Sequence, residues 1–152
     1  IAQGLAGTFD LAFIDGDHSF AAVLDDFMAL EARAAPGALI VLHDTVPLDA
    51  RTAAAERTSG FYSGDGWKLV MALRALRPDL AVATLPVAPT GLTLVGRLAP
   101  ANTTLHASRE AIMAAYESVG AEAVLRRLGG WVALGLTRPE HIVPWLSGVR
   151  GQ

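Results

Sequence analysis

The chain has 152 residues, of which 52% are hydrophobic and only 18% charged, so its composition is that of a folded domain and excludes a disordered one. The net charge of −3 and the presence of a single lysine, Lys68, argue against a nucleic-acid partner, because phosphate binding needs clustered basic side chains. The sequence has no cysteine, which excludes disulfides and thiolate metal sites, and no apolar run of the roughly 18 residues that a membrane span needs. A cytoplasmic location without a membrane partner is the default expectation.

The first half of the chain predicts a strand, a helix and a second strand. After a loop or helix end at residues 1–8, the nearly continuous apolar run FDLAFI, residues 9–14, predicts a strand covered on both faces. Ser19 is the expected N-cap of a helix that the Pro36-Gly37 pair ends. Its apolar residues fall on one helical face: Phe20, Val23, Leu24, Phe27 and Leu30. Residues 38–42, ALIVL, follow as the second strand, and a right-handed crossover places the two strands parallel in one sheet.

The second half predicts a loop over residues 46–66, a helix over residues 67–77 and a hairpin. The hairpin strands are residues 80–87 and 92–97, joined by a four-residue connection over residues 88–91. Residues 108–128 have a helical pattern that Gly120 interrupts. The expected fold class is therefore α/β: a parallel βαβ unit with a closing antiparallel hairpin in residues 1–98, and a helical extension in residues 99–152.

Polar clusters follow both strands of the predicted βαβ unit: Asp-Gly-Asp-His at residues 15–18 and His-Asp-Thr at residues 43–45. Ligands of open parallel sheets bind outside the carboxyl ends of the strands, and neighbouring strands lie about 4.8 Å apart. Asp15 and Asp44 are therefore expected to converge, and a hard divalent cation such as Mg²⁺ would relieve their repulsion. The alternative is ordinary turn chemistry, in which Asp17 helps to cap the helix beside Ser19.

These residues resemble a known family. The string DLAFIDGDHSF, followed by a helix, Pro-Gly, an apolar strand and HDT, resembles the class I S-adenosylmethionine-dependent methyltransferases. It is most similar to the branch of macrocin-type sugar O-methyltransferases and cephalosporin-hydroxylase-like proteins. The resemblance continues through GDGWKLVMALRALRPDLAVATLPVAPTGLTLVGRL and so covers residues 9 to 98. It implies the C-terminal half of a Rossmann-like sheet, with residues 9–14 as the family's fourth strand and residues 38–42 as its fifth.

The resemblance also implies roles for the polar residues. The enzyme would transfer a methyl group from S-adenosylmethionine to the hydroxyl of a small molecule, with Mg²⁺ as a candidate metal. Asp15 and Asp44 correspond to metal ligands, and either His43 or Thr45 supplies the neighbouring ligand. His18 is the candidate general base, because an imidazole titrates near neutrality, with a solvent-facing histidine at a helix start as the alternative. Four consecutive residues are expected at the cofactor: Asp15, Gly16, Asp17 and His18.

Two elements of the family's cofactor site are missing from this sequence. No Gly-rich turn follows a buried strand and opens a helix. The sequence also lacks a counterpart of the acid that ends the family's second strand and holds the ribose of the cofactor. We therefore expect that the N-terminal half is missing, that another polypeptide completes the fold, or that a homo-oligomer covers the exposed strand edge. The chain alone should bind the cofactor poorly. Two rival functions are a non-catalytic α/β module that binds a partner chain and, less favoured, a metal-dependent hydrolase.

Overall fold

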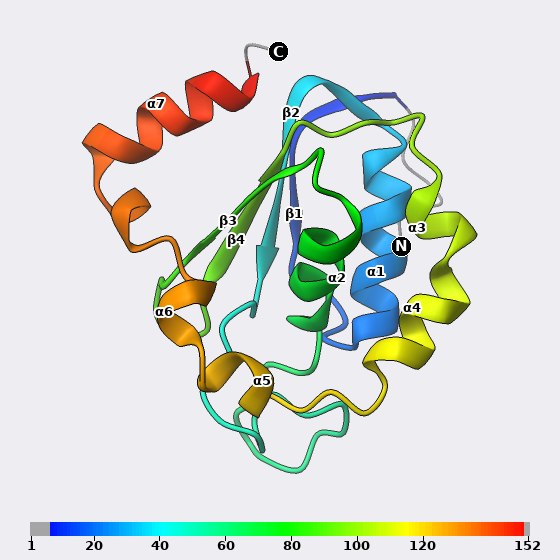
Figure 1. The fold of residues 1–152 in the computed structure, drawn as a ribbon, viewed down its shortest axis with the longest axis vertical. Helices are drawn as coiled ribbons and strands as arrows, with labels where there is room; N and C mark the ends of the chain where they lie inside the picture. The colour runs from blue at the N-terminus through cyan, green and yellow to red at the C-terminus, as the bar shows by residue number, and fades with distance from the viewer. Residues whose placement is uncertain (1–6, 151–152) are drawn as a thin grey trace.

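The computed structural model describes residues 7–150, so most of the predicted segment 1–8 lies outside the described residues. It contains one four-stranded sheet in the order β1-β2-β4-β3 (Figure 1). Strands β1 and β2 pair in parallel, and β4 pairs antiparallel with both β2 and β3. The α/β fold class, the parallel βαβ unit and the closing hairpin are thus confirmed. The strands are β1 Phe9–Ile14, β2 Ala34–His43, β3 Ala81–Leu85 and β4 Leu92–Gly96.

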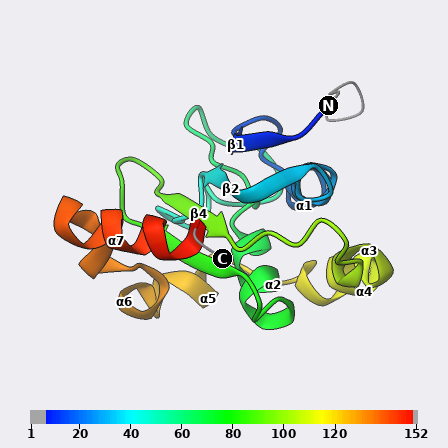
Figure 2. The same ribbon diagram turned by 90° about the horizontal axis from the view of Figure 1, so that it is seen from above.

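Helices lie on both sides of this sheet. In Figures 1 and 2, α1 and α2 stand on one side and α7 on the other. The helical segments are α1 Phe20–Glu31, α2 Lys68–Leu76, α3 Thr104–Ala107, α4 Arg109–Tyr116, α5 Glu122–Leu125, α6 Leu128–Trp131, the 3₁₀ turn η2 Leu134–Thr137, and α7 Pro139–Arg150. The chain beyond residue 98 is helical as expected, with a break between α4 and α5 that contains Gly120. None of these helices combines the length and apolar character that crossing a membrane demands.

Helix α1 begins as the sequence predicts but ends earlier. Ser19 has an extended backbone, and its side chain accepts a hydrogen bond from the backbone N–H of Ala22 at 3.4 Å. The helix ends at Glu31, so the expectation that Pro36-Gly37 would stop it is wrong. The pairing of β1 with β2 explains the difference, because it jumps from Ala34 to Leu39 while β1 advances only from Phe9 to Leu11. Pro36 and Gly37 occupy that irregular stretch of β2, where a missing N–H and a φ of +75° are tolerated.

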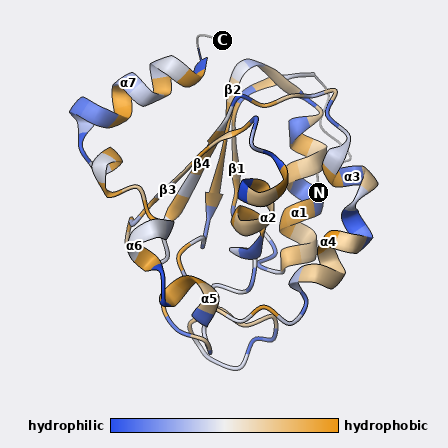
Figure 3. Ribbon diagram, in the orientation of Figure 1, coloured by the Kyte–Doolittle hydropathy of each residue, from blue (hydrophilic) through white to orange (hydrophobic). Residues whose placement is uncertain are grey.

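The main core lies between the sheet and helices α1 and α2, and the C-terminal segments contribute to it. Figure 3 shows apolar residues concentrated in the strands and on α1 and α2. Five members of this cluster come from beyond residue 98: Leu105, Ile112, Ala121, Val124 and Trp131. The helical extension therefore packs on the same core as the sheet. A domain boundary at residue 98 stays a prediction.

The other face of the sheet is covered unevenly. Helix α7 packs closely over β4, since a Cβ on Gly96 would lie 1.9 Å from Cγ1 of Val149. Over β1, at the edge of the sheet, Leu11 and Phe13 are 64% and 57% exposed. The prediction that residues 9–14 are covered on both faces is therefore wrong. The apolar edge expected of a half-sheet is present.

The loop that joins the two hairpin strands, β3 and β4, is longer than expected. Strand β3 ends at Leu85 and β4 begins at Leu92, so the connection has six residues rather than four. Gly91, with φ of +74°, allows close contact with Val46, because a Cβ there would lie 2.2 Å from Cγ2 of that valine. The backbone N–H of Val46 also donates to the carbonyl of Thr90 at 2.7 Å. The hairpin loop is thereby held against the chain that leaves β2.

Candidate active site

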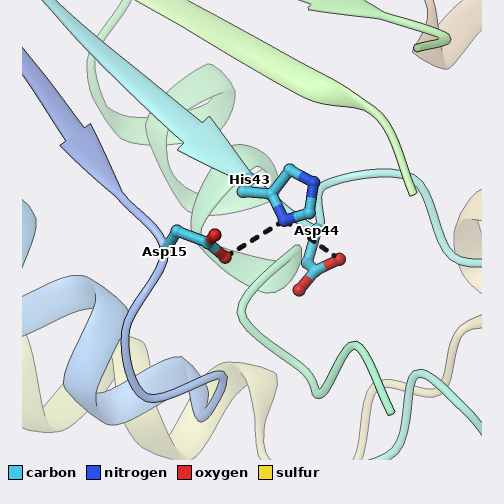
Figure 4. Close-up of side chains that lie close together, drawn as sticks. All are labelled: Asp15, His43 and Asp44. Carbon is cyan, nitrogen blue, oxygen red and sulfur yellow. Dashed lines mark hydrogen bonds and ion pairs between the residues drawn. The ribbon is translucent and has the colours of Figure 1, made fainter. Parts of the chain in front are cut away.

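The two polar clusters meet at the carboxyl ends of β1 and β2. Asp15 follows β1 directly, His43 ends β2, and Asp44 comes next. In Figure 4 the three side chains point toward one another, with Nδ1 of His43 3.1 Å from Oδ1 of Asp15 and 3.4 Å from Oδ1 of Asp44. One ligand atom from each residue lies within 4.8 Å of the others. The expected convergence of Asp15 and Asp44 is confirmed, and His43 stands between them.

Asp44 is the most enclosed member of the group. Its backbone has φ of +55°, a left-handed conformation that aspartate adopts more readily than most residues. One carboxylate oxygen accepts a hydrogen bond from the hydroxyl of Thr90, and the other lies 2.6 Å from Nδ1 of His18. These contacts hold the Asp44 carboxylate in one orientation, so the hairpin loop and the DGDH turn jointly fix it.

His18 is paired with Asp44, so it is not simply a solvent-facing histidine at the start of α1. Its ring lies edge-on to Tyr62, with centroids 6.1 Å apart, and its carbonyl accepts from the N–H of Gly66 at 3.0 Å. Gly64, at φ of +65°, permits this packing, because a Cβ there would lie 2.2 Å from the His18 carbonyl oxygen. The loop before α2 therefore packs against His18, and 33% of the His18 side chain stays exposed to solvent.

The remaining DGDH residues have different surroundings. Oδ1 of Asp17 accepts from the backbone N–H of Ser19 at 2.8 Å, as in the turn-and-cap alternative. Hydrogen bonds from the Ser19 side chain and backbone lower the pKa of Asp17. Gly16 is exposed, with open space where a side chain would project. A cofactor role for these two residues stays a prediction.

Thr45, the other candidate for the neighbouring metal ligand, has a side chain that is enclosed in the protein. It is buried, and its hydroxyl has no hydrogen-bond partner among the described residues. Because His43 Nδ1 lies among the carboxylate oxygens and the Thr45 hydroxyl is shut off from solvent, His43 is the better candidate for the neighbouring metal ligand.

Trp131 on α6 is a supporting residue that sequence reasoning did not connect with the site. Its indole N–H donates to the carbonyl of Thr45 at 2.9 Å. Arg74 lies over the indole ring, 4.7 Å from the ring centroid, and also donates to the Trp131 carbonyl at 2.9 Å. The only sequence signal was a large aromatic residue in the helical extension, 86 positions from its partner.

A pocket lies beside the start of α1, next to the residue that follows His18. Its volume is about 500 Å³, and Ser19, Phe20, Asp65, Lys68 and Met113 are among its lining residues. Asp65 accepts from the N–H of Phe20 at 2.7 Å and from Nζ of Lys68 at 2.9 Å, so a buried ion pair forms part of the wall. Neither Asp65 nor Lys68 is among the site residues predicted from the sequence.

The comparisons with known proteins bear on this site directly. Residues 1–45 match the family described as “Methyltransferase domain”, a range that contains Asp15, His18, His43 and Asp44. A solved structure from Klebsiella pneumoniae, described as “a putative O-methyltransferase”, is 23% identical, with a TM-score of 0.44. The match covers 61% of this chain and 42% of that chain, so the chain spans less than half the length of that solved protein. No curated protein matches the sequence. The family match confirms the resemblance to methyltransferases for residues 1–45, the part of the chain that holds both strand ends of the site.

Proposed function

We propose that the chain takes part in the transfer of a methyl group from S-adenosylmethionine to the hydroxyl group of a small molecule. The observation that carries this proposal is the meeting of Asp15, His18, His43 and Asp44 at the ends of two parallel strands, inside the range that matches a methyltransferase domain. Sheets of this kind bind their ligands at that end. The pocket beside Ser19 is a candidate location for part of the acceptor.

In this proposal His18 is the general base. With Nδ1 donating to Asp44, the imidazole keeps the lone pair of Nε2 available for a proton. The carboxylate also stabilises the imidazolium that forms when His18 takes the hydroxyl proton. The deprotonated oxygen is then the nucleophile that attacks the methyl group of the cofactor, while His18 holds the proton until it passes to solvent.

Asp15, His43 and Asp44 are the residues that would hold a divalent cation. Two carboxylates and one imidazole fit a doubly charged ion, and their ligand atoms already lie within 4.8 Å of one another. Such an ion would supply charge that lowers the pKa of a bound hydroxyl. The chain's own residues would orient the acceptor next to His18, and positioning would provide much of the rate enhancement.

The cofactor loop is proposed to lie on a polypeptide segment other than these 152 residues, since the sequence holds no Gly-rich strand-to-helix turn. Among the described residues no strand pairs with the outer edge of β1, the strand that carries the exposed Leu11 and Phe13, and such a segment would add to the sheet there. A second copy of the chain is the alternative occupant. The same exposed edge favours the second candidate function, a non-catalytic α/β module that binds a partner chain.

The test has two arms. In calorimetry the 152-residue chain should bind S-adenosylmethionine weakly, and tight binding would show that the cofactor loop is not needed. In the natural gene product that contains these residues, His18→Gln should lower kcat for methyl transfer to an accepted hydroxyl compound by about 100-fold or more.

The matched control is His106→Gln, which removes an exposed imidazole on α3 and should leave kcat unchanged. Absence of methyl transfer to every hydroxyl compound tried, or full activity of the His18 variant, would favour the non-catalytic module or another base.

A further inference from the structure

We propose that the Asp15, His43 and Asp44 cluster is a mixed nitrogen–oxygen site that prefers first-row transition metals such as Mn²⁺, Co²⁺ and Zn²⁺ to Mg²⁺. This inference deepens the metal part of the proposed function and rests on it. It concerns the kind of ion that these particular side chains select.

The first step is the donor set. His43 contributes the central atom, because its Nδ1 lies 3.1 Å from a carboxylate oxygen of Asp15 and 3.4 Å from one of Asp44 (Figure 4). In the described residues the cluster therefore offers two oxygens and one nitrogen. The alternative neighbour, Thr45, has its hydroxyl oxygen enclosed in protein, so an all-oxygen set that includes it is not accessible in this conformation.

The second step is the chemistry of those donors. Mg²⁺ is a hard ion that takes oxygen ligands and rarely exchanges its water for imidazole nitrogen. Imidazole suits Zn²⁺, Cu²⁺, Fe²⁺ and Ni²⁺, and affinity for nitrogen and oxygen donors rises along the series from Mn²⁺ to Cu²⁺. Replacing one oxygen donor by Nδ1 of His43 therefore shifts preference away from Mg²⁺, while the two carboxylates keep enough charge for any divalent ion.

The third step is the support around the ligands. Asp44 is held by His18 on one oxygen and by Thr90 on the other, so its carboxylate does not have to be ordered when an ion arrives. Asp15 and His43 are more accessible, with 41% and 28% of their side chains exposed, which leaves the cation a route from solvent. A held ligand beside two reachable ones suits an exchangeable cation better than a sealed structural ion.

The experiment measures binding and does not need catalysis. The 152-residue chain, freed of metal, is titrated with MgCl₂, MnCl₂ and ZnCl₂ by calorimetry, with free Mn²⁺ followed by its electron paramagnetic resonance signal. We expect Mn²⁺ and Zn²⁺ to bind at least about tenfold more tightly than Mg²⁺, because Mg²⁺ takes oxygen ligands and affinity for nitrogen and oxygen donors rises along the first-row series that begins with Mn²⁺. His43→Asp, which gives the cluster three carboxylates and no imidazole, should bring the Mg²⁺ and Mn²⁺ affinities close together.

His106→Asp is the matched control, because it makes the same exchange at an exposed histidine of α3 and should leave the ratio of affinities unchanged. Circular dichroism and the thermal midpoint establish that each variant is folded. Equal or tighter binding of Mg²⁺ in the native chain, or an unchanged ratio in His43→Asp, would overturn this inference alone. If no divalent ion bound, both this inference and the metal part of the proposed function would fall, while the His18 test of methyl transfer would still stand.

Discussion

Two charged clusters lie at opposite ends of the same sheet, and they are built on different plans. At the end where β2 and β3 begin, Arg77 donates two hydrogen bonds to Glu31, at 2.8 and 2.9 Å, and three more to Asp79, at 2.8 to 3.2 Å. The side chains of Arg77 and Glu31 are only 1% and 5% exposed. At the carboxyl end, the side chains of Asp15, His18 and His43 are between 28% and 41% exposed.

The two clusters differ in how completely their charges and hydrogen-bonding groups are paired within the cluster. The guanidinium of Arg77 forms hydrogen bonds with both carboxylates, and Glu31 also accepts from the backbone N–H of Ala99 at 3.1 Å. The buried Arg77 and Glu31 side chains therefore have few hydrogen-bonding groups left for a ligand. The carboxyl-end cluster pairs two carboxylates with two imidazoles, and its described hydrogen bonds and ion pairs involve neither lysine nor arginine. It therefore keeps excess negative charge and accessible donor atoms, which is what a site for a cation and a substrate needs.

Arg77→Met should have the largest effect on stability. It leaves Glu31 as a buried carboxylate without its cation, which costs about 3–5 kcal/mol in the free energy of unfolding. Urea denaturation followed by circular dichroism measures the loss. The double variant Arg77→Met/Glu31→Leu removes the stranded charge and should recover most of it. A loss below about 1 kcal/mol for Arg77→Met would contradict the view that this cluster is structural.

The sequence predicted the elements whose signals are local. An apolar run followed by Ser19 and a 3.6-residue period predicted β1 and α1, and the position of Asp15 and Asp44 after consecutive parallel strands predicted their convergence. The failures involve tertiary structure. Pro36 stops a helix in isolation, but here it lies in an irregular stretch of β2 that depends on pairing with β1.

Two contacts between residues far apart in the sequence could not be predicted, because they also depend on tertiary structure. Arg77 and Glu31 are 46 positions apart, and Trp131 and Thr45 are 86 apart, so no periodicity or motif links them. The apolar pattern of residues 9–14 wrongly predicted a strand covered on both faces, because an apolar strand has the same composition whether it is central or at an edge. The exposure of Leu11 and Phe13 followed instead from the expectation of a half-sheet. Only the packing of α7 and the order of the strands decide it.

Two tryptophan variants can distinguish a loss of global stability from a local change in the chain beside Asp44. Trp131→Phe and Trp67→Phe each remove an indole N–H that donates to a backbone carbonyl, at Thr45 and Ala53 respectively. Both carbonyls belong to buried residues, so each variant should lose about 1–3 kcal/mol in the free energy of unfolding. Only Trp131→Phe should loosen the chain beside Asp44, because Trp67 contacts a different loop.

Amide hydrogen exchange distinguishes the two tryptophan variants. The N–H of Val46, which donates to Thr90, should exchange faster in Trp131→Phe than the loss of global stability explains, whereas in Trp67→Phe it should follow the global change. Mn²⁺ affinity should fall in the first variant only. If the two variants shifted Val46 exchange and Mn²⁺ affinity equally, Trp131 would have no special connection with the carboxyl-end cluster.

The smallest effect is expected at a third charged contact, which is exposed and belongs to neither cluster. Arg109 on α4 donates to both oxygens of Asp25 on α1, at 2.6 and 2.7 Å, and these hydrogen bonds lower the pKa of Asp25. Exposed pairs of this kind contribute between roughly 0 and 1 kcal/mol, so Asp25→Asn should cost no more than that at pH 7.

Because the pKa of Asp25 is lower in the folded chain than in the unfolded one, its contribution is present above its ordinary value of 3.8 and disappears as the pH falls through the lowered value. The difference in stability between the native chain and Asp25→Asn should therefore be constant near neutrality and vanish in acid. Arg109→Gln should cost as much as Asp25→Asn, and the double variant no more than either. Denaturation curves between about pH 3 and pH 7 test this, and a difference that grew toward low pH would contradict it.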